Sequence, residues 1–310
     1  VRARTLEQFS SKYASSGFKP QAFYPCYGMA EATLLISSGD KSSPPIVQSF
    51  DERALNQNQT IRTDRNQPGS RLLVSCGHSW MGGEIRIVNP ETLTACSARE
   101  VGEIWVRGSG IGKGYWNHPK ETKEVFQAYL LDTGEGPFLR TGDLGCLDHG
   151  ELFVTGRLKE VIKLWGRGIY PQQLEESLEN RHSAFLGCAA FSVEKDGAER
   201  IVIAQELDRQ TCRTLTPQQV KTMIKQICRT LLIRHLVDVY AIAFLKPGGL
   251  PKTSSGKVQR RRCQTLFLTG ELPAIEQWIC PAKQRFNYAR WCTWAFRLDK
   301  FNLLSKVLNL

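Results

Sequence analysis

The spacing of hydrophobic and polar positions divides the chain into two differently patterned regions. Residues 71–116 contain short alternating runs (RLLVS, EIRIV and GEIWVRG) separated by Gly, Asn and Pro, which predicts a β-sheet or barrel. Residues 138–157 predict two strands joined by a hairpin turn at 148–150. After Arg157, strand-like runs alternate with helical ones, including a helix over 216–232. We therefore expect a small α+β unit that ends near residue 273, with a helix over about 257–268.

The remaining segments carry weaker patterns. Residues 5–14 and 30–36 have helix-like spacing, and 117–126 predicts a short helix with Pro119 in its first turn. Residues 37–70 are polar and rich in Ser, Pro, Gln and Asn, which indicates a long, weakly structured insertion. Residues 276–310 hold three of the seven tryptophans. They predict either an amphipathic helix for a membrane or partner, or a helix packed on its own protein.

Composition narrows the class of protein. The chain has 310 residues, a net charge of +11 and 41% hydrophobic residues, which is typical of a globular protein of about two domains with polyanionic partners. The ten cysteines include no C-x-x-C pair, so we interpret them as mostly buried, reduced thiols. The N-terminus shows no apolar signal region, and charges interrupt the longest apolar region, 227–245. We expect a cytoplasmic location and no transmembrane segment.

Three short stretches place charged side chains beside glycine. YGMAEAT (27–33) includes Glu31, which could hold Mg²⁺ on a nucleotide or serve as a first-turn helix acid. FLRTGDLG (138–145) places Asp143 in a glycine-flanked turn, where it could accept two ribose hydroxyls or bond its own backbone. GRLKEVIKLWGRGIYP (156–171) surrounds glycines with basic residues, which suits a hinge or a basic surface loop. Each pattern alone leaves both interpretations open.

The stretch LPKTSSGKVQRRR (250–262) carries five basic residues and no acidic one. It is not a P-loop, because Gly249 precedes Gly256 by seven positions rather than five and Val258 follows the lysine. What remains is a flexible Thr-Ser-Ser-Gly loop that presents Lys257. A lysine suits such a position because it is a compact point charge on a long stem.

Together, the motifs YGMAE, TGD, GRxKExIKxxG and PKTxxGK resemble those of the adenylate-forming, AMP-binding superfamily, over about residues 1–273. FYPCYGMAEATLL and GSGIGKGYWNHPKET are most similar to its fatty acyl-AMP ligase branch. The resemblance implies an α/β and α+β multidomain fold. Residues 1–155 would be the back half of the large AMP-binding domain, β-rich or barrel-like, with the insertion at about 37–70. Residues 156–275 would be the small, mobile α+β C-terminal domain, followed by a tail of unassigned role, 276–310.

The same resemblance implies an activity. Enzymes of this branch use ATP and Mg²⁺ to convert a fatty acid to acyl-AMP, and they pass the acyl group to an acyl carrier protein, with CoA disfavoured by the insertion. The implied nucleotide-binding residues, for adenine, ribose or phosphate, are Tyr27, Gly28, Met29, Asp143, Arg157 and Lys163. Glu31 would hold Mg²⁺ and Lys159 would be the hinge. Lys257 would be the catalytic lysine between the carboxylate and the α-phosphate.

One departure from the family pattern bears on activity. No Ser/Thr/Gly-rich phosphate loop ending in Pro-Lys-Gly occurs in these residues, so the chain is similar to the carboxy-terminal portion of such an enzyme. Activity of the 310 residues alone is therefore in doubt. The alternatives are a fatty acyl-CoA ligase and an inactive fragment that only binds, for example, an acidic carrier protein. We expect no nucleic-acid partner, because the basic residues fall on the adenylation motifs.

Overall fold

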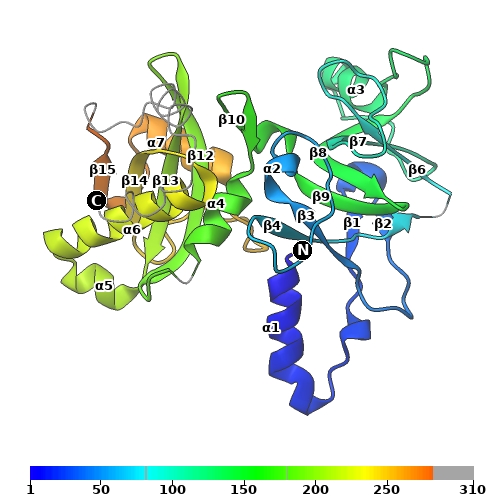
Figure 1. Cartoon of the computed structure of the whole chain (residues 1–310). Coiled ribbons are helices and arrows are strands. Elements are labelled where there is room, and N and C mark those ends of the chain that lie inside the picture. The colour runs from blue at the N-terminus through cyan, green and yellow to red at the C-terminus, as the bar shows by residue number, and fades with distance from the viewer. Residues whose placement is uncertain (81, 180, 282–310) are drawn as a thin grey trace, which may run out of the picture. The chain divides into compact units, whose positions relative to one another are not determined.

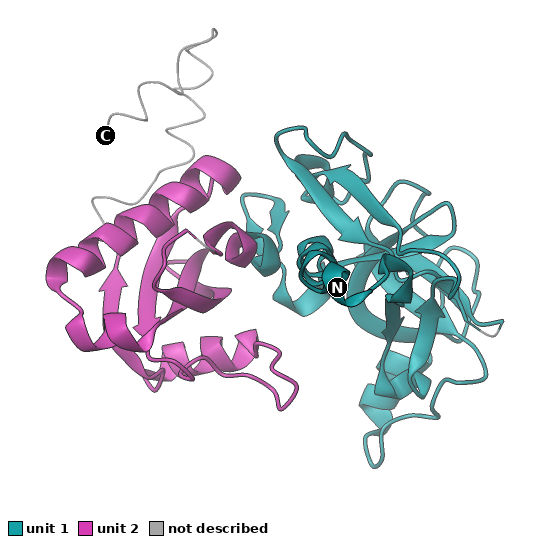
Figure 2. Ribbon diagram, turned by 90° about the horizontal axis from the view of Figure 1, so that it is seen from below, with its two compact units in different colours: residues 1–173 teal, residues 174–310 magenta. Residues whose placement is uncertain are grey.

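Two units, residues 1–173 and 174–310, make up the chain in the computed structural model (Figure 1, Figure 2). The structure describes residues 1–80, 82–179 and 181–281. The predicted tail falls largely outside these residues, and of it only 276–281 is described. No helix in the described part of the chain is long and apolar enough to cross a membrane.

Unit 1 is built mainly from antiparallel strands. Its elements are α1 (Ala3–Tyr13), β1 (Cys26–Gly28), β2 (Leu35–Ser38), β3 (Val47–Asp51), α2 (Glu52–Leu55), β4 (Ser70–Val74), β5 (His78–Ser79), β6 (Glu84–Val88), β7 (Gly102–Arg107), α3 (Pro119–Phe126), β8 (Leu139–Asp148), β9 (Glu151–Arg157), β10 (Ile162–Leu164) and β11 (Arg167–Ile169). The strands form sheets in the orders β1-β2-β5, β3-β4, β6-β7-β8-β9 and β10-β11. The predicted hairpin turn is confirmed, since His149 and Gly150 both adopt positive φ between β8 and β9.

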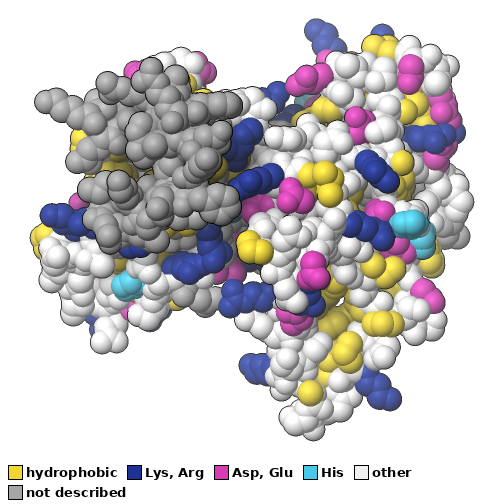
Figure 3. Space-filling view, viewed as in Figure 1, with side chains coloured by type: hydrophobic (Ala, Val, Ile, Leu, Met, Phe, Trp, Pro, Cys, Tyr) yellow, Lys and Arg dark blue, Asp and Glu magenta, His cyan; other side chains and the backbone are white. Residues whose placement is uncertain are grey.

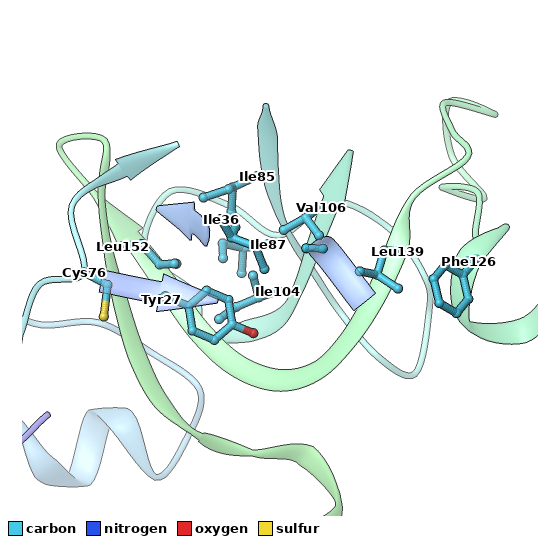
Figure 4. Close-up of a cluster of buried hydrophobic side chains, with 11 residues drawn as sticks. Tyr27, Ile36, Cys76, Ile85, Ile87, Ile104, Val106, Phe126, Leu139 and Leu152 are labelled. Carbon is cyan, nitrogen blue, oxygen red and sulfur yellow. The ribbon is translucent and has the colours of Figure 1, made fainter. Parts of the chain in front are cut away.

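The core that supports the site lies between β1, β2 and the four-stranded sheet. Its buried side chains come from segments far apart in the sequence, and Figure 4 shows Tyr27 beside Ile104 and Leu152 in this cluster. Ile85 and Ile87 point to the same face of β6, as the alternating run EIRIV predicts. The fold thereby holds Tyr27 on a packed surface.

Two expectations for residues 30–70 were wrong. Residues 30–36 are not a helix: a three-residue 3-10 turn, Ala30–Ala32, ends at Thr33 with φ 63°, and β2 then pairs with β1. The polar stretch 37–70 is not weakly structured, because β3 pairs with β4 and α2 follows, capped by Asp51. Phe50 and Leu55 of this stretch are fully buried in a second cluster. A few apolar residues in a polar background therefore supply core contacts.

Unit 2 is a mixed four-stranded sheet with helices on both faces. Its elements are α4 (Pro171–Leu178), which begins at the end of unit 1, β12 (Phe185–Lys195), β13 (Ala198–Leu207), α5 (Arg209–Thr214), α6 (Pro217–His235), β14 (Val239–Leu245), α7 (Arg260–Thr269) and β15 (Ala274–Ile279). The strand order is β12-β13-β14-β15, with β13 and β14 parallel. The sheet thus continues past residue 273, where the sequence pattern ended it.

Burial explains why both faces of this sheet are covered. Alternate strand residues such as Phe191 and Val202 pack with Cys263 of α7, whereas their neighbours Ile203 and Ile242 are equally buried on the opposite face. Helix α6 begins as predicted, since Thr216 and Gln219 form a reciprocal capping box before the first turn. Met223, Ile227 and Leu231 of α6 are buried, whereas Ile233 is 44% exposed.

The division between the units falls after Gln173, downstream of the expected hinge at Lys159. The β10–β11 hairpin packs on unit 1, where the Gly168 amide donates to the Asn56 carbonyl at 3.1 Å. Tyr170 joins the cluster of Phe50 in the same unit. Lysine and arginine side chains are scattered among acidic ones on the face seen in Figure 3. The cysteines in the described residues are free thiols, of which four are buried and only Cys26 is exposed.

Candidate active site

Asp143 is the centre of a three-residue hydrogen-bonded group in unit 1. The Tyr27 phenol donates to Asp143 Oδ2 at 2.8 Å, and Arg157 Nε donates to Asp143 Oδ1 at 2.9 Å. Asp143 and Arg157 are paired neighbours on β8 and β9, so the ladder itself sets their contact. The expectation of a turn at Asp143 was wrong, because the residue lies within β8. The positive φ of Gly142 and a register shift after Leu144 explain the turn-like sequence.

Charge and protonation in this group follow from burial. Burial raises the pKa of Tyr27 far above its usual range, and the neighbouring Asp143 carboxylate raises it further, so the phenol remains a neutral donor. The hydrogen bond to Asp143 is the main cause that raises the pKa of Arg157. The Asp143 side chain is 12% exposed, whereas the Arg157 side chain is 61% exposed. A carboxylate has about four acceptor positions, so Asp143 retains capacity for further hydroxyl donors.

Gly28 allows β1 and the following turn to approach closely. A Cβ at Gly28 would lie 1.7 Å from the Leu34 carbonyl oxygen, a distance at which the backbone would have to move. Gly28 pairs with Leu35 at an irregular position of the β1–β2 ladder. Met29 is partly buried and packs on the same core cluster as Tyr27. The first motif therefore places an aromatic ring, a close backbone turn and a thioether side by side.

Glu31 is fixed by a tyrosine that the sequence interpretation did not include. The Tyr115 phenol donates to Glu31 Oε1 at 2.9 Å, and the Gly112 amide donates to the Glu31 carbonyl at 2.8 Å. Burial, and then Glu31, raise the pKa of Tyr115 to about 12. Glu31 is in a 3-10 turn of three residues, which does not fit the alternative of a helix-dipole acid. The sequence feature that could have indicated Tyr115 is its position in GYWNHPKET, shortly before the start of α3 at Pro119.

The environment of Glu31 is compatible with Mg²⁺. The described residues contain no group of three or more His, Cys, Asp or Glu side chains that could hold a metal by themselves. Mg²⁺, however, is usually bound by one or two carboxylates together with substrate phosphates. Tyr115 occupies one oxygen of Glu31, and within the described chain Oε2 has no hydrogen-bond donor. Glu31 Oε2 is thus the atom of this site that could contact a phosphate-bound Mg²⁺.

An apolar cavity adjoins this segment within unit 1. It has a volume of about 330 Å³ and is lined by β2, by parts of β6 and by residues 106–111. Leu34, Ile36, Ile85, Val106 and Ile111 supply its apolar wall, which begins three residues after Glu31. This wall could contact a hydrocarbon chain, and Glu84 and Arg107 add charged groups to the lining.

The three predicted lysines occupy different surroundings. Lys159 is exposed in the 3-10 turn Leu158–Glu160. Lys163 is exposed on β10, with its ammonium 3.3 Å from Glu91 Oε1. Lys257 belongs to unit 2 and is exposed, and its ammonium has no hydrogen-bond or ion-pair partner among the described residues. The structure therefore brings together Tyr27, Asp143 and Arg157, with Gly28 and Met29 adjoining.

These features define a class of protein. Residues 2–116 match the AMP-binding enzyme family, and residues 159–277 match the AMP domain of Disco-interacting protein 2-like proteins. The chain belongs to the AMP-binding, adenylate-forming family, as its four motifs predicted, and it corresponds to a portion of such an enzyme.

Within this family, the chain is similar to several ligases that act on fatty acids. The chain is 41% identical over 287 residues to medium-chain-fatty-acid–[acyl-carrier-protein] ligase JamA of Moorena producens, covering 91% of this chain and 48% of that protein. It is 32% identical over 283 residues to the putative fatty-acid–CoA ligase FadD25 of Mycobacterium tuberculosis, covering 89% and 47%. A fatty acyl-adenylate ligase structure, from a study of the E. coli and L. pneumophila enzymes, matches with a TM-score of 0.72 and 28% identity, covering 87% and 46%. The chain spans about half the length of these relatives.

Proposed function

We propose that this chain forms part of an enzyme that activates a fatty acid with ATP and then transfers the acyl group to an acyl carrier protein. A carboxylate oxygen of the fatty acid attacks the α-phosphorus of ATP. The bond from that phosphorus to the bridging oxygen breaks, and pyrophosphate leaves. The carrier thiol then attacks the acyl carbonyl carbon, loses its proton, and AMP leaves. The relative JamA is named for the same pair of substrates.

The Tyr27–Asp143–Arg157 group is the observation that carries the proposal. Asp143 would accept the ribose hydroxyls, while Arg157 lies beside it to contact the same sugar. Tyr27, Gly28 and Met29 would lie along the adenine. The neutral Tyr27 phenol and the Arg157 guanidinium keep the Asp143 carboxylate oriented, so that little rearrangement is needed when a nucleotide binds.

Lys257 would supply the positive charge for the first step. Attack of a carboxylate on the α-phosphate brings two anions together, and an ammonium offsets their repulsion and the charge that grows in the transition state. Glu31 would hold Mg²⁺ on the phosphates, where the ion neutralises further charge. Lys159 would be the hinge about which the small domain turns, and Lys163 an additional nucleotide contact. The cavity beside Glu31 has an apolar wall that suits part of the acyl chain.

Pyrophosphate exchange in the full-length protein tests this proposal. With dodecanoate and ATP, we expect exchange that depends on Mg²⁺ and that Lys257→Ala lowers by about 10²–10³-fold, a typical loss for one transition-state contact. Lys225→Met is the matched control, because Lys225 is an exposed lysine of α6 in the same unit. Near-normal exchange in Lys257→Ala, or no exchange in the wild type, would refute the assignment.

A fatty acyl-CoA ligase is the second candidate, favoured by the similarity to FadD25. The first step is the same and only the acceptor thiol differs. Offering CoA and a phosphopantetheine-loaded carrier protein together at equal concentration separates the two. Acyl carrier as the main product supports the first proposal, and acyl-CoA as the main product supports the second.

A further inference from the structure

The loop that presents Lys257 is closed by its own backbone. The Lys257 loop, residues 246–259, connects β14 to α7. The Thr253 amide donates to the Lys257 carbonyl at 2.8 Å, and the Lys257 amide donates to Thr253 Oγ1 at 3.0 Å. Gly256 takes a positive φ of 82° to complete the turn. The backbones of Lys252 and Val258 pair as an isolated antiparallel β-bridge. The sequence predicted a flexible loop, but its main chain is a small hairpin, so the surrounding structure can set where Lys257 points.

A buried carboxylate holds the first side of this loop. Glu206, at the end of β13, is 2% exposed. Its Oε1 accepts hydrogen bonds from the amides of Gly248 and Leu250 at 2.9 and 3.0 Å. Its Oε2 accepts a hydrogen bond from the Lys252 ammonium at 2.8 Å. One side chain thus fixes three positions of the loop that precede Lys257. Gly187 leaves room for it, since an added Cβ there would lie 3.3 Å from Glu206 Oε2.

A second buried carboxylate holds the other side. Glu175 of α4 is 3% exposed, and its Oε1 accepts the Ala190 amide of β12 at 3.0 Å. Arg260, the first residue of α7, donates to both oxygens of Glu175, through Nε at 2.7 Å and Nη2 at 2.6 Å. A two-point arginine–carboxylate contact fixes direction as well as distance. Glu175 therefore ties the start of α7 to the edge strand of the sheet.

The basic partners of the two carboxylates flank Lys257 in the sequence. Lys252 lies five residues before it and Arg260 lies three residues after it. Buried ion pairs are weak contributors to net stability, because removing both charges from water costs about as much as their attraction returns. Their geometric effect is larger, since a reacting group must be held within about 0.5 Å of its productive position. The loop has the contacts that such positioning needs.

We infer that Glu206 and Glu175 are positioning residues that fix the Lys257 loop from its two sides. The inference rests on the proposed function, in which the Lys257 ammonium acts on the substrate carboxylate and the α-phosphate. Neither glutamate touches substrate. Each acts through the loop, so its loss moves Lys257 without removing it. Misplacement of a reacting group by about 1 Å can cost about 10²-fold in rate.

The test uses Glu206→Gln, Glu175→Gln and the milder Lys252→Met in the full-length protein, with Lys225→Met as control. Pyrophosphate exchange with dodecanoate gives kcat and the KM for ATP, and hydrogen–deuterium exchange follows residues 246–258. We expect kcat to fall by about 10–100-fold in the glutamine variants and less in Lys252→Met. The KM for ATP should stay within about threefold, because the proposed adenine and ribose contacts come from other residues, and amide exchange in the loop should accelerate.

Two results would overturn the inference. One is a kcat within about threefold of wild type in both glutamine variants. The other is a kcat loss that only matches the loss of folded protein, with unchanged amide exchange in the loop. Failure of the proposed function gives a different result, because Lys257→Ala would then keep its pyrophosphate-exchange activity. Even in that case, faster amide exchange in the variants would support the structural part of the inference, and unchanged exchange would refute it.

Discussion

The Tyr27 phenol donates a hydrogen bond to Asp143 at 2.8 Å across 116 positions of sequence. The contact joins β1 to the middle of the four-stranded sheet, so the first and second motifs form one site. Its donor stays neutral because burial and the carboxylate both raise the pKa of Tyr27. The pair therefore brings two motifs that lie far apart in the sequence into one candidate site.

Tyr27→Phe should weaken both the fold and the site. The change removes only the hydroxyl, and it leaves Asp143 Oδ2 without this donor in a buried position. A hydrogen bond to a charged group contributes about 1.5–3 kcal/mol, so we expect a loss of that size in the free energy of unfolding, and weaker ATP binding. Urea unfolding measures the first effect and titration calorimetry the second. The control is Tyr129→Phe, at a tyrosine that is 49% exposed, and equal losses in the two variants would contradict the assignment.

Gly28→Ala should be far more damaging than its size suggests. The added methyl would meet the Leu34 carbonyl at 1.7 Å, so the β1–β2 turn would have to shift. Overpacking of this kind costs about 1–3 kcal/mol, which thermal unfolding would record. Gly39→Ala is a matched control, because a Cβ there meets nothing within 4 Å. A melting temperature in Gly28→Ala equal to that of Gly39→Ala would show that the turn adjusts freely.

Sequence reasoning succeeded where a regular period or a short motif was visible. The β8–β9 hairpin, α3, α6 and the strands β12, β13 and β14 follow from alternation and capping signals in single segments, whereas β15 was not predicted. It failed at residues 30–36, because the positive φ of Thr33 and pairing with β1 override helix-like spacing. Tyr115, Glu175 and Glu206 were missed for another reason. Their roles depend on partners 84, 85 and up to 46 positions away, which no local pattern indicates.

The polar stretch 37–70 should be essential to the fold. Phe50 is 1% exposed and packs edge-on against Phe153, with ring centres 5.4 Å apart. Phe50→Ala should lower the free energy of unfolding by about 3–5 kcal/mol, whereas the control Ile61→Ala, at a 57% exposed side chain, should change it by less than about 0.5 kcal/mol. Denaturant unfolding of both variants provides the comparison. Similar values for the two would mean that β3 is not part of the core.

This prediction also bears on the choice of acyl acceptor. Deletion of residues 40–66 would remove β3 and α2 together with Phe50, so a gain of CoA activity in that variant could not be separated from partial unfolding. Replacing only residues 40–43, which are exposed, with glycine and serine leaves the paired strands in place. A change of acceptor in that variant, at unchanged melting temperature, would assign the selectivity to this loop.

Alkaline pH should destabilise unit 1 through Cys146. Cys146 is fully buried, and burial raises its pKa to about 12 from a usual 9.0. Below about pH 9 the thiol is neutral in both the folded and unfolded states, and its stabilising contribution is fully present. Above that pH only the unfolded thiol ionises, so the unfolded state binds fewer protons and stability falls as pH rises toward 12. At pH 11 the loss attributable to Cys146 should be on the order of 2–3 kcal/mol.

Unfolding at pH 8 and pH 11 in wild type and Cys146→Ala isolates this effect. The substitution lowers stability at pH 8, because a buried side chain becomes smaller, but it should make the protein less sensitive to alkali, since the other titrating groups are shared. Thiol labelling at pH 8 gives an independent check. The exposed Cys26 should react first and Cys146 only on unfolding. Equal losses between the two pH values in wild type and variant would mean that the Cys146 thiol ionises alike in both states.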